Sequence, residues 1–296
     1  MQRSYLALFF FLLTTPFYLF AGEHHKISAH FKISAITNNI HLLQGKGGNI
    51  ALLTGKQGNL MVDSDYQDMS DSLKIALKPY GGENKLSYII NTHWHGDHTG
   101  GNKDLHSPAT IIAHDNVRKR LLTRQEIKIF NKISEPYPAH ALPSLTYQKK
   151  ISLHINDEHI EILHYPKGHT DGDSIVFFNT ANVVHMGDHF FSGIFPFVDV
   201  GSGGNVLNMA KNIQQVLQRI DDKTKIIPGH GPLSNKQDLQ NFYDMLISTS
   251  AEVATMQAKG LALSEIQKRG LSKRWKKWGN GFLNEKKWIS ILHSSL

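Results

Sequence analysis

The chain of 296 residues contains no cysteine. This absence excludes disulfide bonds, which stabilise many exported proteins. It also excludes thiolate ligands, so any bound metal ion must be held by nitrogen and oxygen atoms. The sequence has 18 histidines and 25 aspartates and glutamates that could supply such atoms.

Long apolar runs are also scarce, and the one near the length of a membrane span lies at the start of the chain. Residues 1–22 place Arg3 before an apolar stretch that ends at Ala21-Gly22, the order typical of a secretory signal. An uncleaved anchor is the alternative, because about 20 apolar residues span a bilayer. Pro16 and the small pair favour cleavage. We expect a periplasmic or secreted protein with no membrane span after cleavage of the leader.

The net charge of +7 could attract anions, membranes or nucleic acid. Residues 268–277, KRGLSKRWKK, combine basic and aromatic side chains that could contact nucleic acid. The solvated face of a surface helix explains the same pattern and is favoured. No glycine-rich stretch ends in G-K-[ST], which argues against a nucleotide phosphate loop. We therefore expect a small-molecule substrate rather than nucleic acid; nothing in the pattern specifies an oligomeric state.

Short apolar runs separated by turn residues predict strands, and apolar residues at helical spacing predict helices. Strands are expected at 40–43, 50–53, 60–62, 88–90, 110–113, 151–155, 160–163, 175–178, 183–186 and 225–227. Helices are expected at 71–77, 114–122, from 206 onward, through 239–247, at 264–269 and at 285–292. Strand-rich halves followed by helices indicate two packed sheets covered by helices.

Residues 92–101, THWHGDHTGG, follow one of these strands and hold four metal-capable side chains. His93 and His95 share a face of an extended segment, and a turn at Gly96 can bring Asp97 and His98 toward the same point. Imidazole and carboxylate ligands suit zinc and, to a lesser degree, iron or manganese. Four ligands in one loop make two ions plausible. A histidine-rich exposed loop is the alternative.

Three further metal-capable residues follow strands later in the chain. They are His169 in GHT, Asp188 in MGD and His230 in PGHG. Each lies near glycine, which allows the sharp turns that direct side chains into a shared cleft. The repetition of this design strengthens the metal-site interpretation.

The motifs HWHGDH, GHT, MGD and PGHG resemble those of the metallo-β-lactamase-fold superfamily over residues 49–230. The resemblance implies an α/β protein with an αββα four-layer sandwich, formed here by residues 23–296, and Asp63 at an acidic strand end. It also implies a centre of two Zn²⁺ ions, with Fe or Mn as alternatives. One ion would be bound by His93, His95 and His169, the other by Asp97, His98 and His230, with Asp188 bridging.

The resemblance implies a metal-dependent hydrolase that attacks a carbonyl-type substrate (lactam, lactone or thioester), with Asp97 as a catalytic residue. Many β-lactamases of this fold carry cysteine at the second metal, whereas this chain has Asp188 and His98, which is closer to the thioesterase and lactonase pattern. Asn205 could contact substrate or cap the following helix. A phosphodiesterase or nuclease of the same fold and a non-enzymatic periplasmic metal-binding protein are the alternatives.

Other histidines and aromatic residues are expected to lie outside the metal site. His24, His25 and His30 near the mature start should be exposed, His185 should be a core histidine, and His189 should point away from Asp188. The segment from 190 to 204 holds four phenylalanines and then several glycines. It could form an apolar wall and lid beside the cleft, or it could pack in the core.

Overall fold

The computed structural model describes residues 30–105 and 108–296. The predicted leader, residues 1–22, and His24 and His25 lie outside these ranges, so export stays a prediction. Among the described residues, no helix is both long enough and apolar enough to cross a bilayer.

The first sheet has seven strands in the order β1-β2-β3-β4-β5-β6-β9. Strands β1 to β4 pair antiparallel, and β4, β5, β6 and β9 pair parallel. All residues of β3 and β4 are buried, as expected for strands covered on both faces. The bounds are β1 Lys32–Ala35, β2 Ile40–Gln44, β3 Ile50–Leu53, β4 Asn59–Val62, β5 Leu86–Ile90, β6 Thr110–His114 and β9 Leu145–Tyr147.

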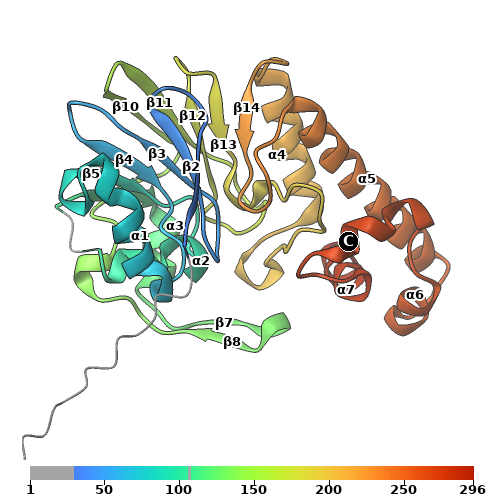
Figure 1. The fold of residues 1–296 in the computed structure, drawn as a ribbon. Helices are drawn as coiled ribbons and strands as arrows, with labels where there is room; N and C mark the ends of the chain where they lie inside the picture. Colours follow the sequence, from blue (N-terminus) through green and yellow to red (C-terminus); the bar gives the residue numbers. More distant parts are fainter. Residues whose placement is uncertain (1–29, 106–107) are drawn as a thin grey trace, which may run out of the picture.

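The second sheet has five strands in the order β10-β11-β12-β13-β14. The first four pair antiparallel, and β14 joins β13 in parallel. The bounds are β10 Lys150–Ile155, β11 Glu158–His164, β12 Ser174–Phe178, β13 Val183–His185 and β14 Lys225–Ile227. A separate hairpin of β7 (Gln125–Ile127) and β8 (Lys132–Ser134) projects beside the sheets (Figure 1).

Helices cover the outer faces of the two sheets. In Figure 1, α1 lies against the first sheet and α4 and α5 lie beside the second. The α4 helix buries Met209, Ile213 and Val216, which recur at the predicted helical spacing. The bounds are α1 Ser70–Leu77, α2 Gly96–Thr99, α3 Asp115–Leu121, α4 Val206–Arg219, α5 Lys236–Ala258, α6 Leu263–Arg269 and α7 Glu285–Ser295.

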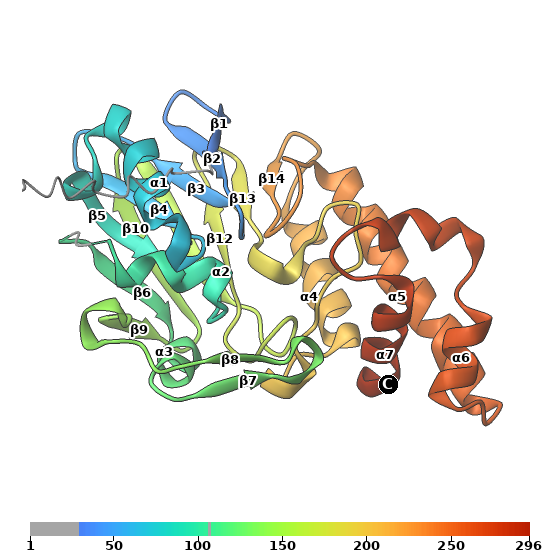
Figure 2. The same ribbon diagram turned by 60° about the horizontal axis from the view of Figure 1, so that its bottom comes forward.

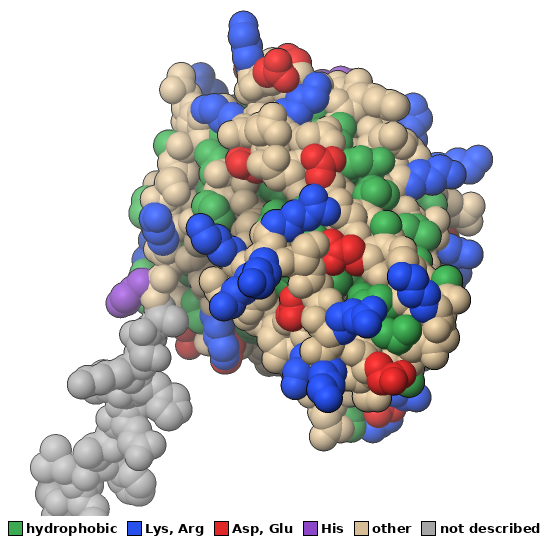
Figure 3. Space-filling model, turned by 90° about the vertical axis from the view of Figure 1, so that its right-hand side faces the viewer, with side chains coloured by type: hydrophobic (Ala, Val, Ile, Leu, Met, Phe, Trp, Pro, Cys, Tyr) green, Lys and Arg blue, Asp and Glu red, His purple; other side chains and the backbone are tan. Residues whose placement is uncertain are grey.

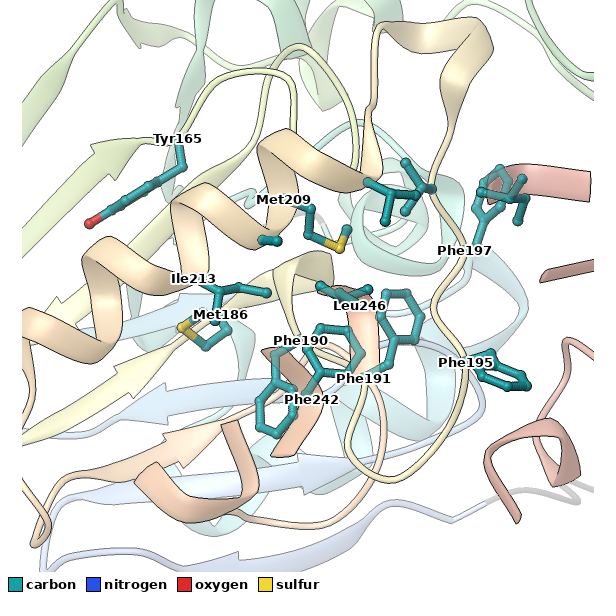
Figure 4. Packing of buried hydrophobic residues seen from close by; sticks show 14 of the residues in the cluster. Tyr165, Met186, Phe190, Phe191, Phe195, Phe197, Met209, Ile213, Phe242 and Leu246 are labelled. Carbon is teal, nitrogen blue, oxygen red and sulfur yellow. The ribbon is translucent and has the colours of Figure 1, made fainter. Parts of the chain in front are cut away.

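Three apolar clusters fill the spaces between these layers. One contains Leu73 and Leu77 of α1 with residues of the first sheet. The second lies between the sheets and joins Val62 and Ile90 to Ile162 and Val176. In the third, Met209, Ile213, Phe242 and Leu246 of α4 and α5 pack near Met186 and Phe190 (Figure 4). The predicted αββα sandwich is therefore confirmed.

Candidate metal centre

The loop that follows β5 carries four of the seven candidate ligands. Asp63, at the end of β4, accepts hydrogen bonds from the backbone N and the Oγ1 of Thr92, both at 2.8 Å. These bonds fix the start of the loop. His93 and His95 follow, and α2 begins at Gly96, so Asp97 and His98 lie in its first turn.

The other three candidates come from the second sheet. His169 lies between β11 and β12, where the carboxylate of Asp173 accepts from its backbone N at 2.7 Å. Asp188 follows β13 in a 3-10 turn that starts at Gly187, whose φ of +50° favours glycine. His230 follows β14. Asp97 and His98 lie in α2, which Figure 2 labels, and the ligand atoms of the other five residues lie close to theirs.

The first ligand cluster contains three buried histidines. The Nδ1 atom of His95 lies 3.1 Å from Nε2 of His93 and 2.8 Å from Nε2 of His169. Burial lowers the pKa of His93 well below its ordinary value and that of His169 to about 4. The rings of His93 and His169 are therefore neutral at pH 7, which is the state that binds metal ions.

The second cluster contains Asp97, His98 and His230. Nε2 of His230 lies 3.3 Å from Oδ2 of Asp97 and 3.4 Å from Nε2 of His98. Burial lowers the pKa of both histidines, but the carboxylates around them outweigh it. As a result the pKa of His98 lies well above its ordinary value and that of His230 rises to about 9. Positive charge is therefore stabilised at this position.

The carboxylate of Asp188 lies between the two clusters. Its Oδ1 is 3.1 Å from Nε2 of His98 and 3.5 Å from Nε2 of His230. Its Oδ2 is 3.4 Å from Nε2 of His169 and 3.8 Å from Nε2 of His93. Within residues 30–105 and 108–296, no hydrogen-bond donor of suitable geometry reaches the buried Oδ1. Buried oxygens without such a donor are rare, and a cation would satisfy this one.

The ligand atoms fit divalent cations. In each cluster they all lie within 4.8 Å of one another, with Asp188 counted in the first. Zinc bonds to nitrogen and oxygen are about 2.0–2.2 Å long, so an ion placed among such atoms can reach them with small shifts. The donor set of imidazoles and carboxylates suits a divalent metal of borderline or hard character.

Comparison with known families supports this interpretation. The sequence pattern that describes the metallo-beta-lactamase superfamily matches residues 43–230 of this chain. The chain belongs to this superfamily. Most members are metal-dependent hydrolases.

Three relatives illustrate the range of the superfamily. This chain is 26% identical over 208 residues to a beta-lactamase-like protein 2 homolog of Caenorhabditis elegans, and the match covers 64% of this chain and 58% of the relative. It is 29% identical over 147 residues to a hydroxyacylglutathione hydrolase of Pelagibacter ubique, covering 49% and 52%. It is 24% identical over 187 residues to a metallo-beta-lactamase type 2 of Bacillus cereus, covering 63% and 68%. The similarity thus spans about half to two thirds of these relatives.

Solved structures share the fold. The DIM-1 metallo-beta-lactamase superimposes with a TM-score of 0.59 at 20% identity, over 74% of this chain and 98% of the other. The sec-alkylsulfatase Pisa1 from Pseudomonas sp. gives 0.66 at 14% identity, over 89% of this chain and 50% of the other. At these identities the likeness describes the fold alone.

Three groups outside the clusters orient the histidine rings. Nδ1 of His98 lies 2.8 Å from Oδ2 of Asp63, and Nε2 of His95 lies 3.0 Å from Oδ2 of Asp199. Nδ1 of His169 lies 2.8 Å from the carbonyl oxygen of Phe197. In each ring this bond engages the nitrogen that faces away from the cluster and leaves the other nitrogen as the ligand atom.

The clusters lie at the wall of a cavity of about 450 Å³. Its lining combines ligand residues, apolar side chains and lysines. The lining residues are Lys46, Gly47, Tyr66, His95, Asp97, Ile127, Phe130, Lys132, Asp188, Phe197, His230, Phe282 and Lys287. A cavity of this size accommodates a small organic molecule next to the ligand atoms.

The structure brings all seven predicted ligands together but does not place Asn205 with them. The side chain of Asn205 accepts from the backbone N of Asn208 at 3.0 Å and donates to the carbonyl oxygen of Ser295 at 2.8 Å. It caps α4 and does not line the cavity. Of the two roles that the sequence allows for Asn205, the structure shows the helix cap.

The structure also assigns places to the other residues weighed in the sequence. His185 is buried, and its Nε2 lies 3.0 Å from the carbonyl oxygen of Asn49. Nε2 of His189 lies 3.0 Å from Nδ2 of Asn212. Neither is among the clustered ligand atoms. Three of the four phenylalanines pack in the core, and Phe197 both packs there and lines the cavity. Trp275, in the basic segment, and Trp278, directly after it, pack partly buried against the same core.

Sequence reasoning missed Asp199, Asp173, Tyr66 and the three lysines of the cavity. Asp199 lies in the segment from 190 to 204, where the phenylalanines and glycines are the features that stand out in the sequence. Asp173 follows the GHT motif by three positions, and this spacing is the one local signal that could have indicated a carboxylate bracing His169.

Proposed function

We propose that this protein is a hydrolase that uses two divalent metal ions to attack a carbonyl-type substrate. The position of the Asp188 carboxylate between the two ligand clusters carries this proposal. His93, His95 and His169 would hold one ion, Asp97, His98 and His230 the other, and Asp188 both. Zinc is the expected metal, with iron or manganese as alternatives.

When bound, two such ions supply a water of lowered pKa and positive charge for the oxyanion that develops on the substrate. The residues of the chain arrange the rest of the reaction. Asp97 lines the cavity and lies 3.3 Å from His230. Its second carboxylate oxygen can accept a proton from the attacking water and pass it to the leaving group. The apolar side chains of the cavity limit the entry of bulk water beside the reacting groups.

The ligand set favours a thioester or lactone over a lactam. Asp188 and His98 stand at positions where many β-lactamases of this fold carry other residues. A relative named hydroxyacylglutathione hydrolase supports the thioester, and one named metallo-beta-lactamase type 2 keeps the lactam among the candidates. Export, which the leader predicts, would place the reaction in the periplasm or outside the cell.

The test measures metal content and hydrolysis on one preparation. Purified protein is analysed for metal by inductively coupled plasma mass spectrometry. It is then assayed on nitrocefin, a thioester, a lactone and bis-nitrophenyl phosphate. We expect two metal equivalents, turnover of the thioester or lactone above nitrocefin, and loss of that turnover in Asp97→Asn.

The other outcomes separate the alternatives. Preferential hydrolysis of bis-nitrophenyl phosphate would replace the proposal with a phosphodiesterase. Two tightly held metal equivalents with no turnover on the whole panel would replace it with a metal-binding protein.

A further inference from the structure

Three lysines from distant parts of the sequence line the cavity. Lys46 lies between β2 and β3, Lys132 begins β8, and Lys287 lies in α7. All three are exposed. The apolar surface between them comes from Ile127, Phe130, Phe197 and Phe282. The cavity therefore pairs cationic groups with an apolar wall.

Two of these lysines differ from the third in having no carboxylate partner in the part of the chain that the structure describes. Lys46 forms an ion pair with Asp68. Over residues 30–105 and 108–296, neither Lys132 nor Lys287 has a carboxylate within ion-pair distance. Instead, Nζ of Lys132 lies 4.8 Å from the ring centre of Tyr66, and Nζ of Lys287 lies 5.3 Å from that of Phe130. An aromatic face holds an ammonium group in place without neutralising it.

The charge distribution of the chain reinforces this feature. Residues 259–296 contain nine lysines and arginines and two glutamates, a net charge of +7 that equals that of the whole chain. Figure 3 faces the side on which α5 and α6 lie, and lysines and arginines outnumber acidic side chains on it. The same segment ends in α7, which contributes Lys287 to the cavity. A positive field of this kind draws anions toward a cleft.

We propose that Lys132 and Lys287 form a subsite for the anionic group of a substrate whose neighbouring portion is apolar. This inference names a substrate class for the proposed hydrolase and therefore rests on that function. The apolar portion would lie against Phe130 and Phe282, and the anionic group would reach the two ammonium groups. Tyr66, whose ring faces the ammonium group of Lys132, lines the same cavity.

The test uses binding rather than turnover. Naphthalenesulfonate, naphthoate and naphthamide share one apolar group. The first two are anions and the amide is neutral, and the sulfonate is a poor metal ligand. Their affinities are measured by isothermal titration calorimetry on the protein as purified and on the double variant Lys132→Gln/Lys287→Gln. The matched control is Lys56→Gln/Lys223→Gln, two exposed lysines in turns before β4 and β14, at the opposite edge of the sheets.

We expect the wild-type protein and the control to bind the sulfonate about tenfold more tightly than the amide. The preference would come from two partly exposed ion pairs between the sulfonate and the ammonium groups of Lys132 and Lys287. The double variant should bind both about equally, and salt should weaken the wild-type preference. Equal affinities in the wild-type protein, or an unchanged preference in the double variant, would overturn the subsite. Because neither result depends on turnover, a failure of the proposed function stays distinguishable.

Discussion

Replacing Asp199 by alanine should weaken metal binding at the first cluster without touching a ligand. Asp199 is 4% exposed, and its Oδ2 lies 3.0 Å from Nε2 of His95. The carboxylate engages that nitrogen, so Nδ1 is left to face His93 and His169. Burial raises the pKa of Asp199, but the contact with His95 outweighs it and the net pKa is lowered. The carboxylate is therefore charged and can make His95 a stronger ligand.

The magnitude follows from carboxylate–histidine pairs at metal sites. Loss of such a partner weakens metal affinity by about 10- to 100-fold. This range corresponds to about 1.4–2.7 kcal/mol. The alanine variant also loses the hydrogen bond that the backbone N of Ser202 donates to Oδ1, at 3.2 Å. A small fall in the stability of the metal-free protein is expected from that loss.

The assay is competition between the protein and a chromophoric zinc chelator. Asp171→Ala is the matched control, because Asp171 lies two residues from His169 but pairs with Arg120, at 2.7 and 2.8 Å. We expect weaker zinc binding in Asp199→Ala and unchanged binding in the control. Wild-type affinity in Asp199→Ala would refute the reasoning that this carboxylate tunes His95.

Two more predictions concern other parts of the structure. Burial, and then the charge of His164, lower the pKa of His114 to about 4. As pH drops from about 6.5 to about 4, the His114 ring binds a proton in the unfolded chain before it does so in the folded protein. The free energy of unfolding therefore falls over this pH range. His114→Asn keeps the acceptor for the backbone N of Asn116, so urea unfolding should show a smaller loss between these pH values, and an identical loss would contradict this origin. A methyl group at Gly229 would lie 2.1 Å from Oδ1 of Asp188, whereas one at Gly201 has its nearest contact at 3.4 Å. Gly229→Ala should therefore retain less metal than Gly201→Ala, and equal metal contents would argue against the position assigned to Asp188.

The sequence was sufficient to predict most of the strands and helices that build the sandwich, but not β1 and β9, the edge strands of the first sheet, or the short helix α2. The motif after β5 and the three glycine-flanked ligands also follow local rules, because each residue stands directly after a strand or in a loop between two strands. Their convergence could be inferred, since the resemblance implied which strand ends meet.

The β7–β8 hairpin and the cavity lysines could not be predicted in this way. Both strands have three residues, too few for a clear alternation, and the left-handed turn residue is Asn131, with φ of +49°. Lys46, Lys132 and Lys287 are exposed residues with no local pattern. They become neighbours of one cavity only after the two sheets, the hairpin and α7 have packed. Asp199 could not be assigned for the same reason, because its partner His95 lies 104 positions earlier, in the loop after β5 of the first sheet.

The most direct measurement is a crystal structure of the zinc-loaded protein with anomalous diffraction data at the zinc edge. We predict two peaks, one among His93, His95 and His169 and one among Asp97, His98 and His230, with an oxygen of Asp188 facing each. A single peak bound by other residues, or none at these clusters in protein that contains zinc, would contradict it.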